Sequence, residues 1–267
     1  MEQRKGMTMR NRAFAPLLIM LLFCLVHCLP TLAQREPPAL SQIRENFAGA
    51  YQCLQERGLA TFSVRVSSDQ MRDICRTLKI DPPELWFDFR SPASFSLRPP
   101  SFDGVATAQR QLIADLHDVI KNSIEGFFQA WEPVAYTNLI PTGSCSARLN
   151  GDNLILEYVE VEPHQTVTLT FDRDFRLETM EARDAERKLA SLVKMSWEKQ
   201  GGRWILRTIQ SEFRSQGTMT FMTRMAIENI AVGSYYLPAR VLIQALDGES
   251  GRPTQATFEI RLDEYRF

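Results

Sequence analysis

The stretch Thr166-Val-Thr-Leu-Thr-Phe171 alternates strictly between threonine and a bulky apolar residue. Successive side chains of a β-strand point to opposite faces of its sheet, so Val167, Leu169 and Phe171 share one face. The stretch Ala256-Thr-Phe-Glu-Ile-Arg-Leu262 repeats this pattern near the end of the chain. A period of two residues predicts half-buried antiparallel strands.

Short turn sequences separate stretches of this kind throughout residues 147–267. Asn150-Gly151 suits the tight turns whose twist matches that of the flanking strands. The other turn sequences are Asp172-Arg173-Asp174, Gln200-Gly201-Gly202, Val232-Gly233-Ser234 and Asp247-Gly248. We therefore expect about seven strands here, joined by hairpins into one antiparallel sheet.

Two of the expected strands are apolar on both faces. They are Leu154-Ile-Leu-Glu-Tyr-Val159 and Trp204-Ile-Leu-Arg-Thr-Ile209, and alternation sets Leu206 on the face opposite Ile209. An antiparallel sheet with one solvated face needs apolar residues on the other face alone. The pattern predicts that helices cover the second face, or that the sheet curls around an apolar space.

Three amphipathic segments supply such helices: residues 42–57, 69–80 and 105–131. We expect Asp69 to cap the second helix, Gly58 to end the first, and Pro133 to end or kink the third. These helices are expected to cover the sheet in one α+β domain, residues 34–267. Within it, residues 34–146 form a helix-rich lid with the first strands, and residues 147–267 form the sheet.

The first 33 residues have the pattern of a secretory signal peptide. Four basic residues precede the apolar run Leu17–Val26, and Thr31-Leu32-Ala33 offers small residues at a cleavage site. The apolar run is shorter than the ~20 residues that cross a bilayer. We therefore expect export to the periplasm or beyond, without membrane integration; an uncleaved anchor is the alternative.

Charge and cysteine usage limit the functional classes further. Four of the 31 basic and one of the 32 acidic residues lie in the first 33, so the remainder carries a net charge of about −4. No basic patch indicates nucleic-acid binding. We expect a disulfide between Cys53 and Cys75 in an exported protein, although the three cysteines after residue 33 permit three pairings. No residue spacing predicts a metal site or a cofactor.

The motif Leu85-Trp-x-x-x-Arg-x-Pro-x-x-Phe95 resembles the second and third strands of the outer-membrane lipoprotein-sorting carriers (LolA-like). A helix and a strand beginning Phe62-Ser63 precede it, as in that family, and Tyr236-Leu-Pro-Ala-Arg240 is similar to a late family hairpin. The resemblance implies an open, strongly curved half-barrel that holds acyl chains on its concave face. The helix inserted at residues 69–80 departs from the family pattern.

We therefore expect a carrier or sensor that binds a lipid or an acylated, lipoprotein-like ligand in an apolar trough. The alternative is an envelope protein-interaction or scaffolding module, whose helices fill the concave face. We expect no enzymatic activity, because no catalytic constellation is recognisable; a secreted enzyme of unfamiliar type is a third reading. Bulky adaptable side chains are the trough candidates: Trp86, Phe95, Met195, Trp197, Trp204, Phe213, Phe221 and Met225.

Overall fold

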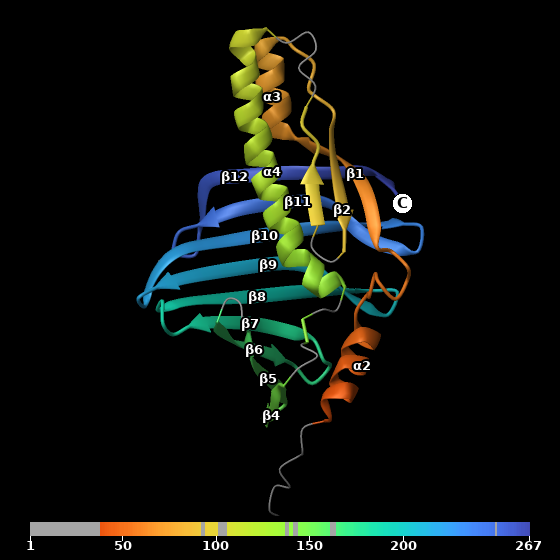
Figure 1. Cartoon of the computed structure of the whole chain (residues 1–267), viewed down its shortest axis with the longest axis vertical. Helices are drawn as coiled ribbons and strands as arrows, with labels where there is room; N and C mark the ends of the chain where they lie inside the picture. Colours follow the sequence, from red (N-terminus) through yellow and green to blue (C-terminus); the bar gives the residue numbers. More distant parts are fainter. Residues whose placement is uncertain are drawn as a thin grey trace, which may run out of the picture. The chain divides into compact units, whose positions relative to one another are not determined.

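Twelve strands form one antiparallel sheet in the computed structural model, and the sheet does not close on itself (Figure 1). The structure describes residues 38–91, 94–100, 106–136, 139–140, 144–160, 164–248 and 250–267. The predicted signal peptide, residues 1–33, lies outside this part of the chain. The order across the sheet is β3-β2-β1-β12-β11-β10-β9-β8-β7-β6-β5-β4. An α+β fold with an open antiparallel sheet is confirmed.

The C-terminal part of the chain is a continuous meander of nine strands rather than seven. Further turns account for the difference, among them those at Lys188 and at Gln216-Gly217, where Lys188 and Gln216 adopt left-handed backbone conformations without being glycines. The strands are β4 (Ser146–Asn150), β5 (Asn153–Glu160), β6 (Gln165–Phe171), β7 (Leu177–Asp184), β8 (Leu189–Gln200), β9 (Arg203–Ser215), β10 (Thr218–Val232), β11 (Tyr235–Leu246) and β12 (Pro253–Arg266).

The N-terminal strands extend this meander at its β12 edge. They are β1 (Thr61–Ser68), β2 (Leu85–Arg90) and β3 (Ser94–Leu97). The expected hairpin is confirmed, with Phe89 opposite Phe95. β1 pairs with β12, where Ser63 lies opposite Arg266. This long-range pairing joins the two ends of the described chain in one sheet.

Three helices accompany the sheet: α2 (Leu40–Ala50), α3 (Asp69–Leu78) and α4 (Thr107–Ala135). α2 ends well before Gly58, because Tyr51 becomes extended and forms a parallel bridge with Trp204. The cap of α3 is Ser68, which makes no side-chain capping hydrogen bond. Pro133, which we expected to end or kink this helix, lies inside α4, so the helix does not end there.

α4 crosses one face of the sheet, which we call the inner face (Figure 1). Its middle is fully buried there: Ile124, Phe127 and Phe128 are all 0% exposed. The Phe128 ring stacks on Phe87 of β2, with the ring centroids 4.7 Å apart. Burial of a large apolar side chain contributes roughly 1.5–3 kcal/mol, so this contact anchors α4 firmly to the sheet.

A β-bulge corrects the expected pattern in β9. Trp197 pairs with Leu206 and Ser196 with Thr208, so Arg207 is an extra residue with no partner in β8. The bulge shifts the alternation by one residue, and Leu206 and Ile209 both join the same buried core. Our assignment of these two residues to opposite faces was therefore wrong.

The predicted disulfide is also wrong, because Cys53, Cys75 and Cys145 form no disulfide. Cys53 precedes β1 and Cys75 follows it in α3. An eight-residue strand spans about 26 Å. A disulfide requires Cα atoms within about 7 Å, so the straight strand between the two cysteines keeps them too far apart.

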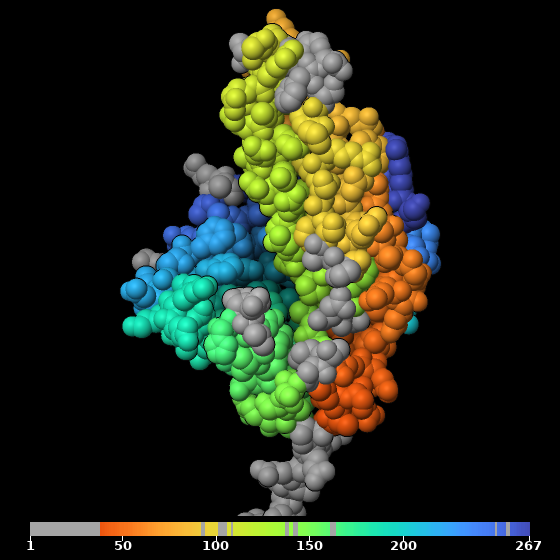
Figure 2. All heavy atoms as spheres, viewed as in Figure 1, coloured from red at the N-terminus to blue at the C-terminus, as the bar shows by residue number. Residues whose placement is uncertain are grey.

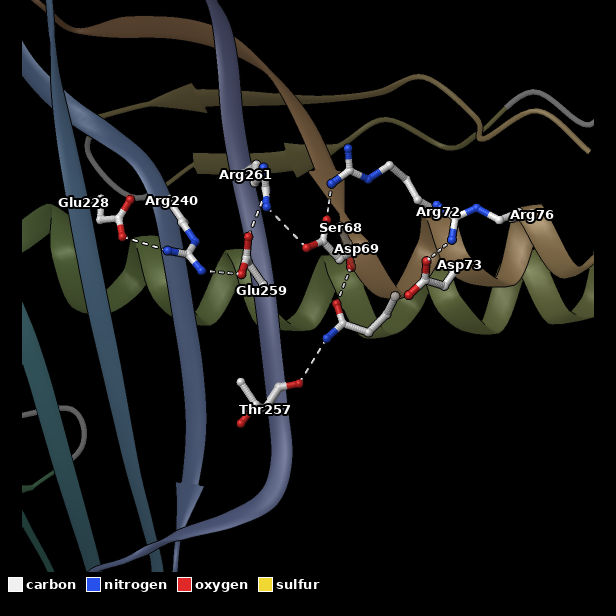
Figure 3. A network of polar contacts seen from close by, with 11 residues as sticks. Ser68, Asp69, Arg72, Asp73, Arg76, Glu228, Arg240, Thr257, Glu259 and Arg261 are labelled. Atoms are coloured by element: carbon white, nitrogen blue, oxygen red, sulfur yellow. Dashed lines mark hydrogen bonds and ion pairs between the residues drawn. The ribbon is translucent and has the colours of Figure 1, made fainter.

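A chain of ion pairs anchors α3 to the outer face of the sheet, the face opposite α4 (Figure 3). Arg240 bridges Glu228 and Glu259, with nitrogen–oxygen distances of 2.8 and 2.7 Å. Arg261 continues the chain from Glu259 at 2.8 Å to Asp69 of α3 at 3.3 Å. The network thus joins β10, β11 and β12 to the first turn of α3.

Candidate functional site

The two flanks of α4 face different surroundings. His117 Nε2 lies 3.3 Å from the Arg98 carbonyl oxygen, and Phe128 packs on Phe87 and Phe89. These contacts direct one flank of the helix toward β2 and the end of β3. At 3.6 residues per turn, Leu112, Leu116 and Val119 project from the opposite flank. That second flank therefore turns away from β2 and β3.

An apolar row of side chains crosses the inner face of these strands. Cross-strand pairing aligns Met195 with Ile209, Ile209 with Met225, Met225 with Ile243, and Ile243 with Phe258. Ile209 is buried, whereas the other four are partly exposed. These five apolar residues, in register across β8–β12, form a continuous apolar surface beside α4.

Beyond this row the inner face opens to solvent. Phe213 pairs with Phe221 across β9 and β10, and their ring centroids are 6.2 Å apart. Phe213 is 46% exposed and Phe221 is 51% exposed. Figure 2 shows the surface hollowed between the yellow-green α4 and the blue strands. We call this hollow the α4 recess; its floor is the apolar row with Phe213 and Phe221, and its wall is the second flank of α4.

The wall of the recess is apolar where an ordinary helix would be polar. Leu116 packs against the main core, but Leu112 is 41% exposed and Val119 is 50% exposed. A helix that packs only on its buried stripe needs no such residues on its flank. Exposed apolar residues on both wall and floor indicate a surface suited to an apolar ligand.

The sequence-predicted residues fall into three groups. Met195, Met225, Phe213 and Phe221 lie on the floor of the α4 recess. Trp197 and Trp204 lie at a different end of the inner face, which the chain itself fills. The remaining candidates, Trp86 and Phe95, lie near β2 and β3, on the far side of α4 from the recess.

The filled end of the inner face centres on Tyr51. Its ring packs edge-on against Trp197, with centroids 4.7 Å apart, and Trp131 of α4 lies nearby. A void of about 20 Å³ remains among these residues and Trp204, Leu206 and Tyr236. Such a space holds about one water molecule, so no acyl chain fits there. The trough expected at Trp197 and Trp204 is therefore closed.

Trp86 points to the outer face of the sheet, because its neighbours Leu85 and Phe87 point inward into the core. The Arg266 guanidinium lies over its ring, 3.6 Å from the centroid. Phe95 stacks with Phe87 and Phe89 on the inner face of the β2–β3 hairpin. Neither residue contributes to the α4 recess.

The titratable groups near the filled end favour their neutral forms. Burial raises the pKa of Tyr51 well above its ordinary value, although a hydrogen bond from the Leu177 amide opposes the shift. Burial also raises the pKa of Tyr158 to about 12. Within the described ranges, no three His, Cys, Asp or Glu residues are grouped to hold a metal ion. No helix in that part of the chain has the length and apolar character to span a membrane.

Sequence reasoning missed two features of the surface. The first is the flank of α4 that carries Leu112, Leu116 and Val119. The amphipathic pattern of residues 105–131 does not show which side of the helix is covered, and only the contacts of His117 and Phe128 reveal that this flank turns away from β2 and β3. The second feature is a larger groove on the outer face near Arg90, Arg98 and Arg266. Polar alternation in β2 and β3 was its local signal, at Asp88, Arg90, Ser94 and Ser96.

Comparison with protein-family models, with curated proteins and with solved structures finds no match for this chain. The function proposed below therefore rests on the contacts, burial and charges of the chain itself.

Proposed function

We propose that this protein is an exported carrier or sensor that binds the acyl chain of a lipid or an acylated protein in the α4 recess. The observation that carries the proposal is the exposure of large apolar side chains on α4 and on the inner face of the sheet: Val119 on α4, and Phe213 and Phe221 on β9 and β10. The signal-like sequence of residues 1–33 supports export to the periplasm. The open half-barrel expected from the LolA-like resemblance is consistent with this use of the inner face.

The energetics favour a chain that lies along the floor beside α4. Each buried methylene contributes about 0.8 kcal/mol, so about ten methylenes contribute about 8 kcal/mol before ordering costs. A micromolar complex requires about 8.2 kcal/mol. Binding of a medium-length chain therefore requires burial along nearly its whole length, and the row of five apolar residues across five strands provides a surface of about 19 Å for this.

The direct test is titration with dansyl-labelled undecanoic acid, together with mass spectrometry of lipids that co-purify with the protein. The variants Val119→Gln and Phe221→Gln place an uncharged polar side chain on the wall and on the floor. We expect saturable binding by the wild-type protein and at least tenfold weaker binding by each variant. Val159→Gln is the matched control, because Val159 is 56% exposed on β5, away from the recess. Absence of both co-purifying lipid and saturable probe binding would refute the proposal.

The filled end of the inner face favours a second candidate, an interaction module of the cell envelope. Tyr51 and Trp131 already cover part of the concave wall, as expected if helices complete a permanent core. In this case the exposed strip of the recess docks a segment of another envelope protein. A photo-crosslinking residue at position 119 separates the two candidates: a lipid adduct favours the carrier, and a protein adduct of defined stoichiometry favours the module.

A further inference from the structure

A second hollow lies on the outer face of the sheet, where β3, β2, β1 and β12 are neighbours. It is a groove of about 530 Å³, far larger than the void beside Tyr51. This volume falls in the usual range for sites that bind small molecules. Polar groups dominate its sheet surface: three arginines, one aspartate and four hydroxyl side chains, from Thr61, Ser63, Asp88, Arg90, Ser94, Ser96, Arg98 and Arg266.

Strand register brings these groups together in two rows on one face. Ser96 lies opposite Asp88, Asp88 opposite Ser63, and Ser63 opposite Arg266. The neighbouring row holds Ser94, Arg90 and Thr61. Paired residues of an antiparallel sheet share a face, so the groove is built from four strands. It lies on the opposite face of the sheet from the α4 recess and does not depend on the function proposed for that recess.

The single carboxylate of the groove is already neutralised. Arg98 donates two hydrogen bonds to Asp88, from Nε and Nη2, each 2.7 Å long. The Ser63 hydroxyl donates a third, 2.6 Å long, to Oδ1. These hydrogen bonds, that from Arg98 above all, lower the pKa of Asp88. Asp88 is therefore a fixed acceptor held in place, and its charge is balanced locally.

Arg90 and Arg266 remain as the cations that are not used in this way. Arg90 is exposed and forms no ion pair with any residue that the structure describes. Arg266 approaches one carboxylate, Glu264, at 3.8 Å, and its side chain is 63% exposed. Its guanidinium lies over Trp86, with the central carbon 3.6 Å from the ring centroid. The side chains of the groove thus carry a net charge of about +2, with its donors arranged around one space.

The spacing of Arg90 and Arg266 suits an anion that accepts from both. Their strands are separated by β1, and their pairing positions on β1, Thr61 and Ser63, are two residues apart. Strand geometry puts their Cα atoms about 12 Å apart. The Arg266 guanidinium lies over Trp86, four residues from Arg90 along β2, so a ligand that accepts from both arginines draws the Arg266 side chain off the Trp86 ring. A phosphate group carries enough charge and enough acceptor oxygens to bind both guanidiniums and a hydroxyl group, whereas a single carboxylate is satisfied by one arginine.

We propose that this groove binds the phosphate group of a small phosphomonoester or of a lipid head group, with Arg90 and Arg266 as its main ligands. The Ser94, Ser96 and Thr61 hydroxyls supply further hydrogen bonds. Arg98 keeps Asp88 from repelling the anion. Phe267 also lines the groove, so the organic part of the ligand contacts an apolar edge.

The test compares glycerol 3-phosphate with vesicles, using protein purified from cells that express the full chain. Calorimetric titration measures binding of the soluble phosphomonoester at low ionic strength. Co-sedimentation measures binding to phosphatidylcholine vesicles with and without phosphatidic acid. The variant Arg90→Gln/Arg266→Gln removes both proposed ligands. The control Arg187→Gln/Arg224→Gln removes two exposed charges elsewhere on the sheet and matches the change in net charge.

We expect wild-type protein and control to bind equally and the groove variant to bind at least tenfold more weakly. Binding of glycerol 3-phosphate identifies a soluble phosphomonoester as a sufficient ligand. Binding to phosphatidic acid vesicles alone identifies the lipid head group. Arg90→Lys/Arg266→Lys keeps the charge but loses the planar donor pairs, so it should restore binding only in part. Failure of the wild-type protein to bind either probe, or equal loss in groove variant and control, would overturn the proposal.

Discussion

The Tyr51 hydroxyl group is expected to be a major local contributor to the stability of the fold. Tyr51 is 1% exposed, and its hydroxyl accepts a hydrogen bond from the Leu177 amide and donates one to the Phe175 carbonyl, over 2.5 and 3.0 Å. Phe175 adopts a left-handed conformation, with φ of 58°, which is unfavourable for a residue with a Cβ atom. The hydroxyl thus holds the turn between β6 and β7 in a conformation that the turn does not favour alone.

The substitution Tyr51→Phe removes this hydroxyl and keeps the ring that packs on Phe47 and Trp197. The Leu177 amide and the Phe175 carbonyl then lose their partner in a buried place. Each unsatisfied buried group costs about 1–3 kcal/mol. Because water can reach the exposed side of the turn in part, we expect a total loss of about 2–4 kcal/mol in the free energy of unfolding.

Urea unfolding followed by tryptophan fluorescence measures this loss. The control is Tyr235→Phe, whose hydroxyl donates a 2.9 Å hydrogen bond to the Arg57 carbonyl at an exposed position. Water replaces that partner, so we expect a loss below about 1 kcal/mol. Equal losses in the two variants, or a loss below about 1 kcal/mol for Tyr51→Phe, would show that Tyr51 does not hold the turn as we describe.

Two further predictions concern charge. Arg240→Gln leaves the largely buried Glu259 with Arg261 as its remaining cation in the network of Figure 3. Because Arg240 itself is exposed to solvent, we expect urea unfolding to show a small loss of stability. Hydrogen bonding from Arg240 lowers the pKa of Glu259 below its usual 4.5, so this stabilisation is present above pH 4.5 and is lost as the pH falls through the folded-state pKa. On acidification the Arg240→Gln variant should therefore lose less stability than the wild-type protein. Parallel acid profiles of the two proteins would contradict the assignment. Tyr158 is neutral in the folded protein up to its pKa of about 12, while the unfolded chain ionises near 10. Stability should therefore fall between pH 10 and about 12, and Tyr158→Phe should reduce this fall in thermal unfolding scans; an unchanged alkaline profile would contradict it.

Local pattern was sufficient to predict most elements of the fold. Alternation of apolar and polar residues identified β6 and β12, and the β2–β3 hairpin was expected at its observed place. These features depend on neighbours in the sequence, which is why they are readable without a structure. The exposed face of β12 and the buried face of β6 followed from the same argument.

The features that sequence reasoning missed depend on long-range contacts. The bulge at Arg207 exists because β8 and β9 pair out of simple register, and alternation alone does not reveal an inserted residue. Trp86 was expected inside the trough because it is large and apolar, but Arg266 covers it on the outer face. Arg266 reaches that position through the pairing of β1 with β12, which joins residues at the two ends of the described chain.

The candidate site shows the same difference between features set by local sequence and features set by long-range contacts. Phe213, Phe221 and Met225 were expected to line an apolar surface; Phe213 lies opposite Phe221, and Met225 lies on the same face of β10. The sequence placed Trp197 and Trp204 with them, because it contains no sign that Tyr51 leaves its helix to pack between them. Which part of a concave face remains open is decided by the side chains of other elements, and here those elements are α2 and the last turns of α4.

The burial of α4 determines how a ligand would enter. A ligand that lifted the helix would have to expose Phe127, Phe128 and Trp131, all buried against the sheet. At roughly 1.5–3 kcal/mol for each side chain, lifting costs about 5–9 kcal/mol. That cost removes more than half of the about 8 kcal/mol available from about ten methylenes, and at its upper end all of it, so displacement of α4 leaves little net affinity for such a chain. A ligand that slides along Val119 and Phe221 avoids the cost entirely, and this is why the recess beside the helix, rather than the space beneath it, is the place where an acyl chain would bind.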